Sequence, residues 1–137
     1  KRGETEIHEA DSRFCKNKAE KCESRKDYTK WEKHGLVNPH FYEVSYLSAR
    51  DMYVRLHVGE EEYNTSKKLN DILAGRKLYL TVLDNQFNVI GESELATKRY
   101  SLLTGWCITP DAVLLYVDNP LSGESKEEIF EYDELKW

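Results

Sequence analysis

From residue 41 onward, the hydrophobic positions follow the short period that is typical of β-strands. Runs of aromatic and β-branched residues are separated by turn-forming residues such as Gly, Pro, Asn and Asp. Within residues 52–58 the alternation is strict: the even-numbered positions are apolar, and the odd-numbered positions hold Tyr53, Arg55 and His57. The strands that this pattern predicts are residues 42–47, 52–58, 78–83, 87–92, 102–108, 112–117 and 128–135.

The predicted strands fall into two groups, the first between residues 42 and 92 and the second between residues 102 and 135. The connections are alternately short and long, and the pattern predicts no long helix. One helical turn is expected at residues 69–74, where Gly75 ends it. This succession of strands indicates an all-β fold built from antiparallel sheets.

Two of the predicted strands, residues 78–83 and 112–117, are apolar at nearly every position. A sheet with one wet face has alternating strands, whereas the sheets of a β-propeller pack against a neighbour on both faces. We therefore expect four-stranded antiparallel sheets that form about two to three blades of a β-propeller. The candidate blades are residues 40–95 and 99–135.

A β-propeller closes with at least about four blades, so residues 1–137 hold too few strands for a closed ring. Three explanations stay open. The chain is a fragment of a longer propeller, copies of it assemble, or the strands form no blades. Under the first two, the isolated chain exposes apolar blade faces and self-associates.

Residues 11–39 differ from the rest of the chain because they are polar and have few β-branched residues. After a short predicted strand at residues 5–10, we expect a long polar loop here, with a helical turn around residues 27–33. Loops of this length are natural places for functional additions to a fold. Cys15 and Cys22 lie within the loop and would pair as a disulfide in an oxidising compartment, with free thiols as the alternative.

Composition narrows the class of protein. The aromatic share of 12% is too high for a disordered chain. The net charge of −5 argues against a nucleic-acid partner, since such proteins present a basic face. The longest apolar run, residues 112–117, is too short to span a membrane as a helix.

Four segments, in order and spacing, carry a family resemblance: residues 42–56, 83–92, 106–120 and 129–132. They resemble the C-terminal third of DUF4221 proteins, which are six-bladed, TolB-like β-propellers found mainly in Bacteroidota. Residues 8–14 resemble a strand end nearer the middle of such proteins. The resemblance implies a propeller of unassigned function, exported to the cell envelope behind a lipoprotein signal, and it implies no catalytic residues.

Tyr53, Arg55 and His57 are the candidate ligand-binding residues, because strand alternation places them on one face. Arginine offers a fork of donors and histidine a titratable donor, which suits a carboxylate or a sugar. The alternative is an exposed strand face with ordinary cross-strand pairs.

Other chemistry-bearing residues give weaker patterns. Three tryptophans would suit stacking on a sugar ring. One of them, Trp106, lies inside a predicted strand and is expected in the core. Two histidines flank a short loop and would suit a metal or a base. The histidines nearest to the cysteines show no ligand-type spacing to them, so we expect no metal and no cofactor. These residues are Trp31, Trp106, Trp137, His34 and His40.

The sequence therefore favours a non-catalytic binding or scaffold module that presents a surface to a ligand or a protein. Its partners would be the remaining blades of the same propeller or further copies of the chain. The alternative is a carbohydrate-active hydrolase or lyase with its site in the propeller channel. That alternative requires carboxylates to converge within about 5–10 Å, and the candidates are Glu43, Asp51, Glu92 and Asp118.

Overall fold

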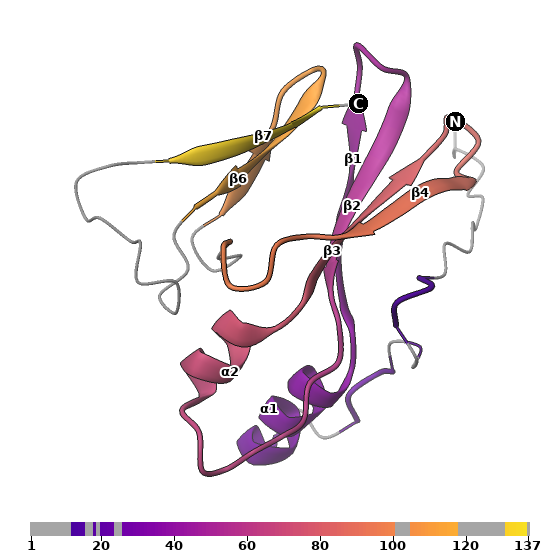
Figure 1. The fold of residues 1–137 in the computed structure, drawn as a ribbon. Coiled ribbons are helices and arrows are strands. Elements are labelled where there is room, and N and C mark those ends of the chain that lie inside the picture. The colour runs from indigo at the N-terminus through magenta and orange to yellow at the C-terminus, as the bar shows by residue number, and fades with distance from the viewer. Residues whose placement is uncertain are drawn as a thin grey trace.

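The structure is a computed structural model that describes residues 12–15, 18, 20–23, 26–100, 105–117 and 131–136. It is mostly β, with two short helices (Figure 1). The predicted strand at residues 5–10 lies outside the described residues. The elements are α1 (Tyr28–Val37), β1 (His40–Leu47), β2 (Met52–Val58), α2 (Leu69–Gly75), β3 (Leu78–Leu83), β4 (Val89–Glu94), β5 (Trp106–Ile108), β6 (Ala112–Tyr116) and β7 (Tyr132–Lys136).

The predicted grouping of the strands is confirmed. Strands β1 to β4 form one antiparallel sheet in sequence order, and β5 to β7 form a second. Every pairing between these strands is antiparallel. All six residues of β3 are buried, as expected from a strand that is apolar on both faces.

The hydrophobic core lies between the two sheets. The inner face of the first sheet packs against β6, where Val113 and Leu115 are fully buried. Trp106 of β5 and Leu135 of β7 are partly buried against the same core. Burial of each such aliphatic side chain contributes about 1.5–3 kcal/mol. The residues of the first sheet in this core are Leu47, Val54, Leu56, Val58, Leu78, Leu80 and Val82.

Helix α1 corrects the expectation of a loop with one helical turn, because it has ten residues. The Asp27 side chain accepts a hydrogen bond from the Lys30 amide and so caps the first turn. Asn38 caps the other end, and the following Pro39 disfavours further helix. Leu36 is the helix's buried residue. With so little apolar surface facing the core, the helix lacks the periodic apolar stripe that would have predicted it.

Arg76 joins both helices to the end of the first sheet. Its buried guanidinium donates to the carbonyl oxygens of Gly59, Gly35 and Asn38, with Nε–O and Nη–O distances of 2.9 Å. Two of these carbonyls belong to the end of α1, where backbone acceptors have no partner within the helix. Figure 1 places both helices at the same end of the sheet. Among the described residues, no helix is long and apolar enough to cross a membrane.

Candidate functional site: the outer face of the first sheet

The outer face of the first sheet points away from the core between the sheets. The register of β2 against β3 pairs Arg55 with Thr81 and His57 with Tyr79, and Thr81 in turn pairs with Glu92 of β4. Tyr53 lies on this same face, since side chains two residues apart on a strand share a face. The three sequence-derived candidates therefore stand together with Thr81, Tyr79 and Glu92.

Aromatic rings stack across this face. The His57 ring lies between Phe41 and Tyr79, with ring centroids 5.0 and 5.1 Å away and interplanar angles of 29° and 24°. Tyr79 stacks in turn on Phe14 at 4.8 Å. The Arg55 guanidinium lies 4.4 Å above the Phe41 ring, a cation–π contact. The stack leaves His57 with 0% of its surface exposed.

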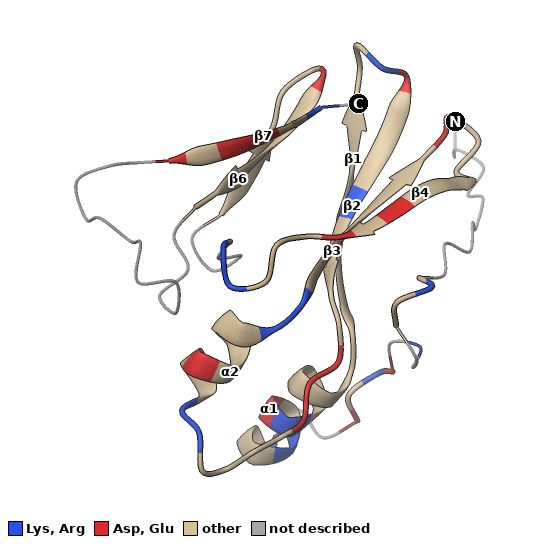
Figure 2. Ribbon diagram, viewed as in Figure 1, with Lys and Arg blue, Asp and Glu red and all other residues tan. Residues whose placement is uncertain are grey.

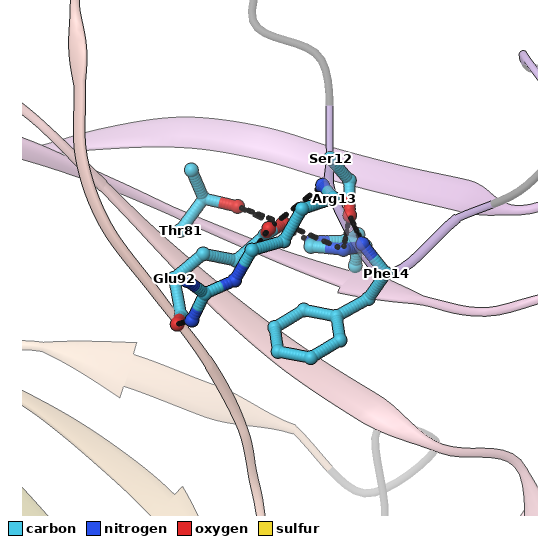
Figure 3. Close-up of polar contacts among 6 residues, drawn as sticks. Ser12, Arg13, Phe14, Thr81 and Glu92 are labelled. Atoms are coloured by element: carbon cyan, nitrogen blue, oxygen red, sulfur yellow. Dashed lines mark hydrogen bonds and ion pairs between the residues drawn. The ribbon is translucent and has the colours of Figure 1, made fainter.

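A hydrogen-bond network runs beneath the stack (Figure 3). The Thr81 hydroxyl donates to Glu92 Oε1 at 3.3 Å. Its oxygen also lies 3.4 Å from His57 Nδ1, at hydrogen-bond distance. His57 Nε2 and the Ser12 hydroxyl oxygen are hydrogen-bonded at 3.0 Å. The same Nε2 lies 3.4 Å from Glu92 Oε1.

Residues 12–15 lie across the outer face and are held there by Glu92. The Arg13 amide donates to Glu92 Oε2 at 2.9 Å, and the Arg13 guanidinium donates to the Glu92 carbonyl oxygen. The Phe14 amide donates to Ser12 Oγ at 3.1 Å. Arg13 and Glu92 are 79 positions apart in the chain. The network therefore joins two distant parts of the sequence.

Burial lowers the pKa of His57 to about 4, although the Glu92 carboxylate beside it acts in the opposite direction. The imidazole is neutral near pH 7. A serine hydroxyl hydrogen-bonded to a neutral histidine is the arrangement that activates nucleophiles. Here the Ser12 oxygen already accepts from the Phe14 amide, and His57 has no exposed surface. The arrangement is a closed hydrogen-bond network that fixes residues 12–15 on the sheet.

The other half of the outer face carries three aromatic rings in a row, which we call the aromatic ladder: Tyr46, Tyr53 and Phe87. Their centroids are 4.9 and 4.5 Å apart. Phe87 has a φ of 63°, a left-handed conformation that an aromatic side chain rarely adopts. Asp51 accepts hydrogen bonds from the Tyr46 hydroxyl and the Asn85 side-chain amide, both at 2.9 Å, and so fixes the position of the Tyr46 ring.

The candidate carboxylates lie in different surroundings. Glu43 is exposed on β1, Asp51 is in the β1–β2 turn, and Glu92 is buried beneath residues 12–15. Asp118 lies outside the described residues. Within the described part of the chain, no group of histidine, cysteine and carboxylate side chains is arranged to hold a metal ion.

The remaining candidates are separated as well. The His34 Nε2–H donates to the Glu20 carbonyl oxygen at 2.8 Å, and His40 packs edge-on against Tyr42. Trp31 is exposed on α1, Trp106 is half-buried against the core, and Trp137 lies outside the described residues.

Cys15 and Cys22 are both half-buried free thiols. Burial raises the pKa of the Cys15 thiol, and nearby Glu60 and Glu92 act in the same direction, so the nucleophilic thiolate is disfavoured. A disulfide between the two cysteines in an oxidising compartment stays a prediction.

Two antiparallel sheets around one core, with a buried polar network on the far side of the larger sheet, define a mostly β protein without an evident catalytic centre among its described residues. No protein-family model matches the chain, and no curated protein matches it. Its structure is similar to that of a member of the DUF4221 family from Bacteroides vulgatus, with a TM-score of 0.64 and 16% sequence identity. The match covers 82% of this chain and 32% of that one. At this identity the similarity is one of fold, and the chain spans about a third of the length of that protein.

Replacing Glu92 with alanine is expected to release residues 12–15 from the sheet. The Arg13 amide would lose its acceptor, so its hydrogen exchange, followed by NMR, should accelerate at least about tenfold, the equivalent of about 1.4 kcal/mol. Glu94→Ala is the matched control, because Glu94 lies on the same strand but pairs with Lys77 near the surface. Equal exchange of the Arg13 amide in the two variants would contradict the role of Glu92.

Proposed function

We propose that this chain is a non-catalytic binding or scaffold module, part of a β-propeller, that offers the outer face of its first sheet to a further β-sheet. The division of that face carries the proposal. Residues 12–15 cover the half around His57, whereas Val44, Tyr46 and Val89 remain exposed on the half that holds the aromatic ladder. In the intact protein the further sheet would belong to the remaining blades.

Exposed apolar surface of this kind supports a docking role. The aromatic ladder runs from β1 over β2 to Phe87, which precedes β4, and Val44 and Val89 are exposed on β1 and β4. Contiguous apolar patches on soluble proteins commonly mark interaction sites. Aromatic side chains are also enriched where proteins meet, since they bury a large area with few rotatable bonds.

The backbone of Phe87 adds a second argument. A left-handed conformation costs a non-glycine residue about 1–2 kcal/mol, and Phe87 adopts it while its ring stacks on Tyr53. Strain of this kind tends to persist where function maintains it. Placement of the ring at the end of the ladder fits a surface that must present a continuous aromatic row.

The length of the structural relative agrees with the proposal. A protein of that size has room for the further sheets that would cover the open half of the outer face. The alternative of a carbohydrate-active hydrolase or lyase has no comparable support, because Glu43, Asp51 and Glu92 lie in different surroundings. It stays a prediction.

The test uses the isolated chain, whose outer face lacks the further sheet and should pair with a second copy. Sedimentation velocity is expected to reveal concentration-dependent self-association at micromolar to millimolar protein. Tyr46→Lys should weaken the association at least about tenfold by placing a charge in the apolar contact.

Tyr132→Lys is the matched control for this experiment. Tyr132 is 49% exposed and packs on Tyr116 at 5.2 Å, while Tyr46 is 44% exposed and packs on Tyr53 at 4.9 Å. The two tyrosines therefore differ chiefly in the sheet that they occupy. A chain that stays monomeric over this range, or one whose association responds equally to both substitutions, contradicts the proposal.

A further inference from the structure

Tyr28 and Trp31 form an exposed aromatic pair at the start of helix α1. Their side chains are 69% and 53% exposed, and their ring centroids are 6.0 Å apart with an interplanar angle of 34°. Neither ring belongs to the core between the sheets. The two aromatic side chains contact each other and water. A ligand that covered them would bury apolar surface, which favours binding.

The pair lines a hollow of about 660 Å³ together with Cys22 and Lys26. This volume lies within the range of small-molecule sites, which combine aromatic walls with a few polar groups that fix the ligand's orientation. The aromatic rings of this hollow supply the wall, and Lys26 supplies the charged group.

The charge around the hollow favours a ligand with a single negative charge. No ion pair holds Lys26, which precedes α1, within the described residues, whereas Lys30 on α1 pairs with Asp27 at 3.5 Å. Figure 2 shows both acidic and basic residues on α1. A long polyanion, such as a nucleic acid, would also be repelled by the net charge of −5.

We propose that this hollow binds a hexuronate, a six-membered sugar ring with one carboxylate, alone or at the end of a short oligosaccharide. The flat C–H face of the ring packs on Trp31 and Tyr28, which buries apolar surface on both partners. The Lys26 ammonium pairs with the carboxylate. The site is separate from the outer face of the first sheet, so its failure would leave the proposed docking role standing.

The experiment follows the Trp31 indole N–H by NMR during titration with galacturonate and glucuronate, and with galactose and glucose as neutral counterparts. The uronates are expected to shift this signal saturably and to bind about tenfold more tightly than the neutral sugars, because they alone engage the ammonium. Trp31→Ala should abolish saturable shifts of the Tyr28 amide. Trp31→Phe should retain weaker binding, which separates loss of stacking from loss of the helix.

Lys26→Gln tests the charged contact. It should reduce the preference for uronate over neutral sugar to about one. Lys33→Gln changes an exposed lysine of α1 outside the hollow and should leave the preference unchanged. Three outcomes would overturn the proposal: no saturable shift with either uronate, equal affinity of the wild-type protein for uronates and neutral sugars, or tighter binding of a mononucleotide than of the uronates.

Discussion

Replacing Arg76 with methionine is expected to lower the free energy of unfolding by about 3 kcal/mol, measured by urea denaturation. Methionine keeps the apolar stem of the side chain but removes donors to the carbonyl oxygens of Gly59, Gly35 and Asn38. Hydrogen bonds from a charged group are worth about 1.5–3 kcal/mol, and buried acceptors left without a partner carry their own desolvation cost. The substitution therefore removes the hydrogen bonds that hold the end of helix α1 to the sheet.

Lys77→Met is the matched control for this prediction. Lys77 follows Arg76 directly, but its ammonium is exposed and pairs with Glu94 at 3.2 Å. Exposed ion pairs contribute about 0–1 kcal/mol, so this variant should unfold close to the wild-type midpoint. A second variant, Arg76→Lys, keeps the charge and loses the fork of donors, and intermediate stability is expected. Equal midpoints for Arg76→Met and Lys77→Met would contradict the structural role of Arg76.

Acidification from pH 6.5 to pH 4 is expected to destabilise the protein through His57. The pKa of this imidazole is lowered from 6.5 to about 4 in the folded state. Between these values the unfolded chain binds a proton that the folded chain excludes, so unfolding is favoured as the pH falls. The stabilising contribution is fully present above pH 6.5, and its loss amounts to about 3 kcal/mol by pH 4.

Two measurements check this prediction. An NMR titration of the His57 ring protons in the wild-type protein should give a pKa of about 4, against 6.5 for an unperturbed histidine. In denaturation experiments, His57→Phe keeps a ring between Phe41 and Tyr79 and should flatten the dependence of stability on pH across this window. His40→Gln removes an exposed histidine of the same sheet and should leave the dependence of stability on pH unchanged. A His57 that titrates near pH 6.5 would contradict the prediction.

Strand prediction succeeded where local pattern and burial agree. The run from residue 78 to residue 83 is apolar on both faces of its strand, and every residue of β3 is buried. Helix α1 shows the opposite case. Its capping by Asp27 is a local feature of the sequence, but Leu36 alone is buried, and Tyr28 and Trp31 face water. Without an apolar stripe, periodicity gives no signal for such a helix.

The candidate site was only partly predictable. Alternation along β2 placed Tyr53, Arg55 and His57 on one face, and the register agrees. The surroundings of His57 were not predicted, and the one available signal was a threonine, Thr81, inside an otherwise apolar strand. Polar residues at such positions are hydrogen-bonded when buried. The sequence holds no indication that its partner comes from β4 or that Ser12 covers it.

The sequence by itself determined the strands, their hairpin order and their division into two sheets, because these features depend on alternation and turns within short stretches of chain. Only the tertiary structure decided which polar side chains are buried and which aromatic ones are exposed. The contact between Arg13 and Glu92, 79 positions apart in the chain, depends on the packing of distant segments and leaves no local pattern. A one-dimensional pattern specifies which face a residue occupies, whereas the packing of distant segments specifies what covers that face.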